Sequence, residues 1–143
     1  MQIRPAQPSD CNQLIRLLLE LGYRTTEDIF REQSTVYDKS DFCRLLVAES
    51  DENKISGLIA GSLIPLMHQS GSLGRITVFV VGLEFREHGV GTALLSSLEK
   101  WFKENNCLRI EVTSGDHREA AHRFYEARGY IQDERRFIKS NVS

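Results

Sequence analysis

The stretch "REHGVGTALL", residues 86–95, decides the fold, because it takes the chain through two glycines into a long amphipathic helix. Glycine costs backbone entropy at the start of a helix, so the pair predicts that something must approach the main chain closely. The first amides of a helix have no partner within it, which makes an anion the expected ligand. Arg86 adds a positive charge that suits a pyrophosphate. A tight connection without a ligand remains the alternative that the glycines leave open.

The segments on either side of this turn predict a strand, a helix and another strand. Before it, "SLGRITVFVV", residues 72–81, is rich in β-branched residues and too short for a comfortable helix, so we expect a central strand. After it, apolar residues follow helical spacing up to "ENN", and "LRIEVTS" then alternates as a strand. The helical apolar set is Val90, Ala93, Leu94, Leu98, Trp101 and Phe102.

The N-terminal half predicts a strand, two helices and an antiparallel hairpin. "MQIRP" is the first strand, and Ser9 is the expected N-cap of a helix that ends at Gly22. Thr25 with Asp28 resembles a capping box for a short helix ending near Ser34, and "TVYDKSD" is expected to be polar loop. "RLLVAES" and "KISGLIAGSLI" flank the turn "DENK" and predict the hairpin, which a proline ends at position 65.

The C-terminal part predicts one more helix and a closing hairpin. Asp116 with Glu119 can cap the helix, Gly129 ends it, and "YIQDERRFIK" is expected to fold back as two strands. The chain contains no repeat or linker, so residues 1–143 are predicted to form a single domain of the α/β class with a mixed sheet.

Charge and cysteine content limit the function. The chain has 18 basic and 20 acidic residues, so the net charge of −2 disfavours a nucleic-acid partner. No apolar run approaches the roughly 20 residues that span a bilayer, and no leader is visible, so neither a membrane partner nor export is expected. Cys11, Cys43 and Cys107 are odd in number and form no CxxC pair, which favours free thiols and a cytoplasmic location.

Two familiar phosphate-binding loops do not match the glycine turn. A P-loop requires Lys followed by Ser or Thr after its second glycine, whereas Thr92 and Ala93 follow Gly91. A dinucleotide fingerprint requires a third glycine where this chain has Leu94, and its acidic ribose ligand would be Glu111, which is in the middle of a strand. A dinucleotide-dependent oxidoreductase is therefore the less favoured reading.

Two motifs resemble those of the GNAT superfamily of N-acetyltransferases. "VVGLEFREHGVGTALL" is similar to its acetyl-CoA-binding segment, with the Arg/Gln-x-x-Gly-x-Gly/Ala turn at Arg86, Gly89 and Gly91. "AAHRFYEARGY" resembles its A-x-x-F-Y-x-x-x-G-F/Y helix, and the matching residues are Ala121, Phe124, Tyr125, Gly129 and Tyr130. The resemblance covers nearly the whole chain. It implies a mixed, mostly antiparallel sheet of six to seven strands with about four helices and a splayed central strand pair.

The resemblance also implies that acetyl-CoA is the cosubstrate and that no metal takes part. It further implies where acetyl-CoA binds. The pantetheine arm would lie along the strand before the turn, and the pyrophosphate would bind the amides of the turn. The implied cofactor-binding residues are Phe79, Val80, Val81, Arg86, Glu87, His88, Gly89, Val90, Gly91, Thr92 and Tyr125.

The implied reaction is direct transfer of the acetyl group to a primary amine. It needs a neutral amine, a group that stabilises the oxyanion and a proton for the departing thiolate. By resemblance, a main-chain N–H within residues 79–81 faces the oxyanion and Tyr125 is the catalytic residue that donates to the CoA sulfur. A core aromatic beside Phe124 is the alternative for Tyr125.

The general base stays open. Many relatives have a glutamate on the central strand, but here Arg75, Thr77, Val78 and Phe79 occupy those positions. Glu111 and His122 are candidates, and so are a water relay or an already neutral amine. None of the four strand residues takes a proton readily at neutral pH, so the base must lie elsewhere or be unnecessary.

Other chemistries are not indicated. His117 and His122 are five residues apart and do not share a helical face, so no metal site is expected. Ser62 has no nucleophile elbow and Cys107 no evident base, which argues against a covalent acyl-enzyme. A further departure from the family is Arg118, which stands where it often has asparagine.

The acceptor is only weakly indicated. Glu20, Tyr23, Tyr37 and His68 lie in regions that shape the acceptor pocket in relatives, and the C-terminal motif is similar to that of small-molecule transferases. The alternatives are a protein or peptide amine and a non-catalytic acyl-CoA-binding module. The resemblance also makes a homodimer plausible.

Overall fold

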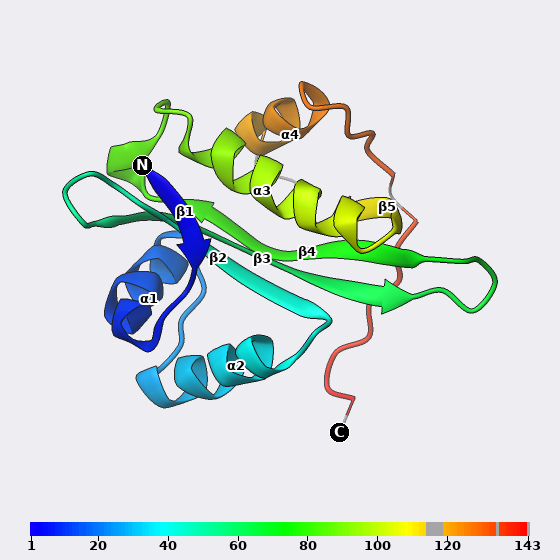
Figure 1. Ribbon diagram of the computed structural model, residues 1–143, viewed down its shortest axis with the longest axis horizontal. Helices are drawn as coiled ribbons and strands as arrows, with labels where there is room; N and C mark the ends of the chain where they lie inside the picture. The colour runs from blue at the N-terminus through cyan, green and yellow to red at the C-terminus, as the bar shows by residue number, and fades with distance from the viewer. Residues whose placement is uncertain (114–118, 134, 143) are drawn as a thin grey trace. The chain divides into compact units, whose positions relative to one another are not determined.

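The computed structural model describes residues 1–113, 119–133 and 135–142 in two compact units, Met1–Val112 and Thr113–Ser143. The first unit holds a five-stranded sheet in the order β1-β2-β3-β4-β5 (Figure 1). Its strands are β1 (Gln2–Pro5), β2 (Cys43–Glu49), β3 (Ile55–Pro65), β4 (Ser72–Val81) and β5 (Cys107–Val112). Its helices are α1 (Cys11–Glu20), α2 (Glu27–Lys39) and α3 (Val90–Glu104), with short 3-10 turns at Pro8–Asp10 and Leu83–Phe85. The second unit contains α4 (Glu119–Glu126).

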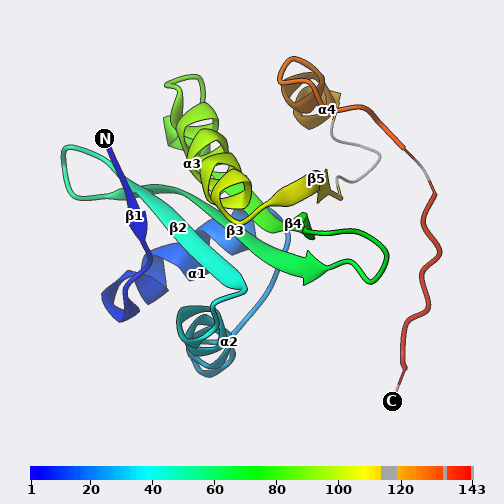
Figure 2. The ribbon, with the colours of Figure 1, turned by 45° about the vertical axis from the view of Figure 1, so that its right-hand side comes forward.

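The topology of the sheet confirms the predicted mixed α/β class. Neighbouring strands from β1 to β4 are antiparallel, whereas β4 and β5 are parallel and are joined by α3. Figure 2 shows α1 and α2 on one face of the sheet and α3 on the other. The hairpin of β2 and β3, the end of β3 at Pro65 and the strand–helix–strand crossover all lie where the sequence predicted them.

The predicted number of strands is wrong, because the sheet has five strands and not six to seven. The expected hairpin over "YIQDERRFIK" is absent from the described residues of that segment. Its apolar residues Ile131, Phe137 and Ile138 are exposed instead of buried on one strand face. Alternating polarity predicts a strand only where a neighbouring edge accepts its backbone hydrogen bonds. In the described sheet, β4 lies in the interior between β3 and the edge strand β5.

The caps and the length of the first two helices differ from the prediction. Ser9 lies within the 3-10 turn, and the N-cap of α1 is Asp10. Thr26, not Thr25, caps α2, because its hydroxyl accepts from the Ile29 amide at 3.2 Å. This helix continues to Lys39, through the segment that was expected to be loop. The helix ends predicted at Gly22 and Gly129 are confirmed, since both glycines have positive φ within three residues of the ends of α1 and α4.

Two apolar layers hold the first unit together. On the face covered by α1, a buried cluster joins that helix to β2, β3 and β4. Its members are Leu14, Leu17, Val47, Ile55, Leu58 and Val80. On the other face, α3 lies so close to the sheet that a Cβ at Gly61 or Gly74 would come within 2.7 or 2.8 Å of the Phe102 ring. Glycine at these positions is what allows a fully buried phenyl ring between helix and sheet.

A buried ion pair fixes the entry into α1. Asp10 is 4% exposed, and its carboxylate accepts two hydrogen bonds from Arg4, at 2.9 and 3.0 Å, and one from the Gln7 amide at 2.8 Å. Arg4 also donates to Glu49 of β2 at 3.0 Å. Burial alone would raise the pKa of Asp10, but these hydrogen bonds and the Arg4 charge outweigh it and lower the pKa.

We expect Asp10→Asn to lower the free energy of unfolding at pH 7 by about 1.5–3 kcal/mol, the usual value of a hydrogen bond to a charged group. The pKa of Asp10 is lower in the folded protein than in the unfolded chain, where it is about 3.9. The Asp10 contribution is therefore complete above that value and is lost as the pH falls through the folded pKa. Urea unfolding between pH 7 and pH 3 checks this, because the two proteins should converge at low pH. Asp41→Asn is the control, since Asp41 is exposed in the turn before β2.

Candidate active site

The strand before the glycine turn outlasts its parallel neighbour. Pairing of β4 with β5 ends at Ile76–Val112, whereas β4 continues to Val81 and stays paired with β3 on its other edge. From Thr77 onward, no strand in the described chain pairs with that edge of β4. Phe79, Val80 and Val81, the residues expected to contact the cofactor, lie on this part of the strand. An extended ligand arm could add to this edge as a further strand does.

A β-bulge stands where β4 loses its neighbour. Ala60 of β3 is opposite Val78 and Gly61 is opposite Ile76, so Thr77 is an extra residue in β4. The Thr77 hydroxyl lies 2.8 Å from the Tyr37 hydroxyl of α2, and either can donate. Bulges next to active sites redirect side chains. This bulge presents Thr77 to α2, and Thr77 is one of the four strand residues that occupy the positions where many relatives have a glutamate.

The predicted anion-binding turn has the backbone of a helix N-terminus that is open to solvent. Gly89 is the N-cap of α3 with φ +78°, and a Cβ built there would meet nothing within 4 Å. The Ala93 amide donates to the Gly89 carbonyl at 3.1 Å, so the amides before Ala93 precede the first helical hydrogen bond. Arg86, Glu87 and His88 are exposed beside it. The left-handed backbone thus favours glycine, and none of the described residues fills the space next to it.

Three charged side chains meet where β4 and β5 still pair. Arg75 and Glu111 are register partners, and Arg75 Nη2 donates to Glu111 Oε1 at 3.0 Å. Arg109 Nη2 lies 2.6 Å from Glu111 Oε2. Both oxygens of Glu111 are therefore paired with guanidinium groups, which argues against its role as general base. Sequence reasoning missed Arg109, although Arg109 and Glu111 are two apart on one strand and so share a face.

The residues predicted for the acceptor pocket are only partly brought together. Glu20, at the end of α1, accepts a long hydrogen bond of 3.4 Å from the Leu83 amide in the β4–α3 connection. Tyr37 contacts β4 through Thr77. Tyr23 lies exposed in the α1–α2 loop and His68 lies exposed in the β3–β4 turn, so neither has a fixed place in a site.

In the second unit, Tyr125 is held by aromatic neighbours. It is half-buried on α4, and its ring centroid lies 5.6 Å from that of Phe124 and 5.5 Å from that of Tyr130. The Arg128 guanidinium stacks on Phe124 at 3.6 Å. His122 is three residues before Tyr125 and shares its helical face. His117, Arg118 and Asp116 lie outside the described residues.

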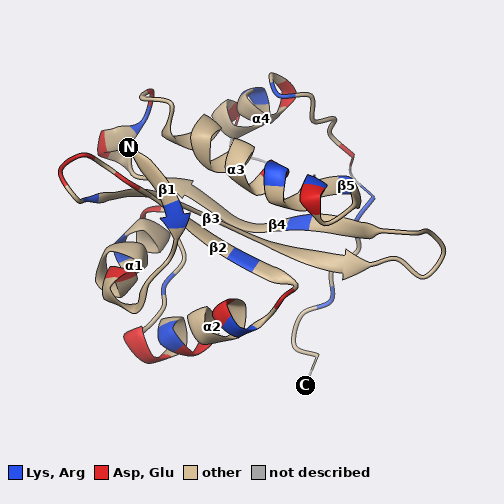
Figure 3. Cartoon of the chain, in the orientation of Figure 1, with Lys and Arg blue, Asp and Glu red and all other residues tan. Residues whose placement is uncertain are grey.

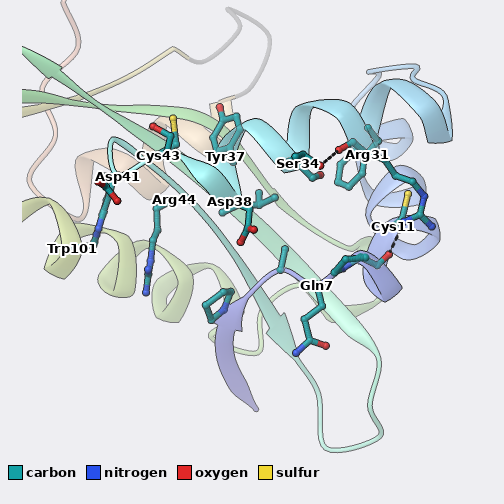
Figure 4. Close-up of a pocket in the computed structure, with 17 residues that line it drawn as sticks. Gln7, Cys11, Arg31, Ser34, Tyr37, Asp38, Asp41, Cys43, Arg44 and Trp101 are labelled. Atoms are coloured by element: carbon teal, nitrogen blue, oxygen red, sulfur yellow. Dashed lines mark hydrogen bonds between the residues drawn. The ribbon is translucent and has the colours of Figure 1, made fainter.

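A pocket of about 520 Å³ lies at the outer edge of β2, away from the glycine turn (Figure 4). β1 covers β2 only from Leu46 onward, so the start of β2 borders this pocket together with α2 and Trp101. None of the predicted cofactor-binding residues lines it. Asp38 and Asp41 line it together with Arg31 and Arg44, so its opposite charges balance and select no class of ligand.

The described residues offer neither a reactive thiol nor a cluster of metal ligands. Cys11, Cys43 and Cys107 are free thiols, and burial raises the pKa of Cys107, which disfavours its thiolate. Among the described residues, no three His, Cys, Asp or Glu side chains are grouped to hold a metal ion. None of the described helices has the length and hydrophobicity needed to cross a bilayer.

Comparison with known proteins gives consistent matches. Residues 12–130 match the model of the acetyltransferase (GNAT) family, a region that extends through both units. The aminoalkylphosphonate N-acetyltransferase of Salmonella typhimurium is 26% identical over 97% of this chain and 90% of its own. A GNAT family acetyltransferase structure from Staphylococcus aureus is 30% identical over 96% of each chain, with a TM-score of 0.79. An aminoglycoside 6'-N-acetyltransferase from Acinetobacter haemolyticus shares the fold, with a TM-score of 0.82 at 19% identity over 98% of this chain and 97% of that one.

Proposed function

Because the chain belongs to the GNAT family of acetyltransferases and is therefore an acyltransferase, we propose that it transfers acetyl from acetyl-CoA directly to the primary amine of a small molecule. The observation that carries the proposal is the stretch of β4 that runs past β5 and leads into an open helix N-terminus. A thioester ligand fits these two features, because its extended arm can lie along β4 and its diphosphate can bind at the start of α3. Residues 1–143 would act as one catalytic domain.

The main chain would do most of the cofactor binding. The edge of β4 at residues 79–81 can pair with the amide groups of the pantetheine arm, as an added strand would. The amides of residues 86–92 can bind the diphosphate, helped by the Arg86 charge and by the partial positive charge at the start of α3. Acetyl-CoA then supplies an acetyl group activated as a thioester.

Two groups of this chain would act on the reacting atoms. A main-chain N–H within residues 79–81 would stabilise the oxyanion as the amine nitrogen bonds to the carbonyl carbon. As the carbon–sulfur bond breaks, the Tyr125 hydroxyl would give its proton to the thiolate. The pairing of Glu111 with two arginines leaves His122 or a water relay to take the proton from the ammonium nitrogen before attack, unless the amine binds already neutral and needs no base.

The acceptor class rests on the relatives. The Salmonella relative is named for aminoalkylphosphonates and the Acinetobacter fold relative for an aminoglycoside, and both compounds are small amines. A protein amine and a non-catalytic acyl-CoA-binding role are the alternatives. The cytoplasmic location and the homodimer stay predictions.

The experiment compares acetyl-CoA with NAD in thermal unfolding. We expect stabilisation by acetyl-CoA alone, because a ligand that binds only the folded state raises the midpoint by mass action. Gly91→Val should weaken acetyl-CoA binding about 10- to 100-fold, as expected when one or two charged hydrogen bonds are blocked. Without ligand, the variant should melt no lower, since valine at a helical position costs no more than glycine.

His88→Ala is the matched control, because His88 is exposed in the same turn and offers no main-chain contact that the substitution removes. Equal loss of affinity in both variants, measured by calorimetry, would contradict binding by the main chain. CoA release with a set of amines then separates the enzyme from a binding module. Acetyl-CoA binding without CoA release from any amine would favour the module.

A further inference from the structure

Arg75 and Thr77 present their side chains on the α2 face of the sheet. Gly74 faces Phe102 of α3, and side chains alternate along a strand, so Arg75 points to the opposite face. The contact between Thr77 and Tyr37 of α2 identifies that face as the one covered by α2. β4 is otherwise uncharged, and Figure 3 shows it with a single basic segment, its only arginine. Glu111 contacts Arg75 from the neighbouring strand.

The cluster of Arg75, Arg109 and Glu111 has a net positive charge and unused donors. The side chains of Arg75 and Arg109 are 40% and 68% exposed. Among the described residues, each contacts Glu111 through Nη2, and the Nε of Arg75 is buried without a hydrogen-bond partner. A buried donor without an acceptor is destabilising, so a rearrangement that gives Arg75 a further acceptor is favoured. The two guanidinium groups can thus accept an anion in place of, or beside, the one carboxylate.

We propose that Arg75 and Arg109 bind an anionic group carried by the acceptor, so that the substrate is a short amine with a phosphonate, phosphate or carboxylate at its other end. This rests on the proposed acetyl transfer. About 7 Å of strand separates Arg75 from Thr77, where β4 leaves β5 and the acetyl group would arrive. If the amine and the anionic group of the acceptor are a few bonds apart, the acceptor and the Arg75 side chain together span that distance.

The same cluster disfavours a polycationic acceptor. Two guanidinium groups beside the reacting amine repel additional ammonium groups, and the single carboxylate is already paired with both. Guanidinium groups bind tetrahedral and planar anions through parallel hydrogen bonds, which gives orientation as well as affinity. The cluster therefore selects by charge among small amines.

The test compares 2-aminoethylphosphonate with 3-amino-1-propanol, an amine of similar length that carries no anionic group, and with a polycationic aminoglycoside. We expect kcat/KM for the phosphonate to be at least about tenfold higher than for either, the value of one charged hydrogen bond. Arg109→Gln should remove this preference by raising KM for the phosphonate, and it should leave kcat/KM for 3-amino-1-propanol unchanged. Arg16→Gln, which removes an exposed arginine on α1, is the control for net charge.

Glu111→Gln provides a readout of opposite sign. Glu111 competes with the ligand for both arginines, so its neutralisation should tighten binding of ethylphosphonate, an anion without an amine, several-fold in calorimetry. Arg109→Gln should weaken the same binding. A merely structural role for Glu111 predicts a loss in both variants and would overturn the proposal.

The outcomes separate the two proposals. If ethylphosphonate binds as described and no amine is acetylated, acetyl transfer to small amines is wrong, and the anion site remains as a binding site only. If 3-amino-1-propanol, the phosphonate and the aminoglycoside are acetylated with equal kcat/KM, the anion site is wrong and the acetyl transfer stands. Absence of ethylphosphonate binding to the unmodified protein would also overturn the anion site.

Discussion

Replacing Phe102 with alanine is expected to lower the free energy of unfolding by about 3–5 kcal/mol, the range for removing a buried aromatic side chain. The Phe102 ring is fully buried between α3 and the sheet and fills the space above Gly61 and Gly74. Because these glycines have no side chains to close the gap, the cavity would persist. Denaturant unfolding measures the effect as a shift of the midpoint at constant slope.

A matched set of variants tests this interpretation. Gly74→Ala adds a methyl group 2.8 Å from the Phe102 ring and should cost about 1–3 kcal/mol by overpacking. Phe102→Leu should partly rescue it, because contacting residues are not additive. Trp101→Ala is the control, since Trp101 is the neighbouring aromatic but remains partly exposed. A loss with Trp101→Ala as large as with Phe102→Ala, or no rescue in the double variant, would contradict the close fit.

The elements that the sequence predicted correctly depend on local patterns. The helical spacing of Val90, Leu94 and Leu98 defines α3, and the left-handed Gly89 defines its start. The second half of α2 was missed because its inner face is only weakly apolar. Phe30, Ser34 and Tyr37 have helical spacing and are half-buried, but only Phe30 is strongly hydrophobic. Packing on the sheet determines this part of the helix.

Some features of the candidate site also depend on local motifs, whereas others depend on how the strands pair. The glycine turn and the Tyr125 helix are short motifs, so they were visible in the sequence, although their roles stay predictions. The ion pairs of Arg75 and Arg109 with Glu111 depend on the register between β4 and β5, and the contact of Tyr37 with Thr77 depends on the bulge. Neither register nor bulge follows from the pattern of one strand. The sequence indicated that the strand has no glutamate. It could not indicate which side chains contact the residues that stand there instead.

Replacing Tyr125 with phenylalanine is expected to lower kcat by about 10²- to 10⁴-fold, the usual contribution of a general acid. The phenyl ring keeps the packing of Tyr125 against Phe124 and Tyr130, so the fold should be preserved and the Kd of acetyl-CoA should change little. Such a split between turnover and affinity separates proton donation from a purely structural aromatic. Stopped-flow or steady-state CoA release gives kcat, and calorimetry gives the Kd.

Tyr130→Phe is the control for this variant. Tyr130 is a second phenol that contacts Tyr125, and the family motif that the chain resembles accepts either Phe or Tyr at its position, so loss of its hydroxyl should leave turnover unchanged. Loss of rate in both variants would point to a shared effect on the aromatic cluster. An unchanged rate for Tyr125→Phe across the pH range would show that another group, or solvent, protonates the departing thiolate. In that case the half-buried His122, on the same face of α4, becomes the next donor to replace.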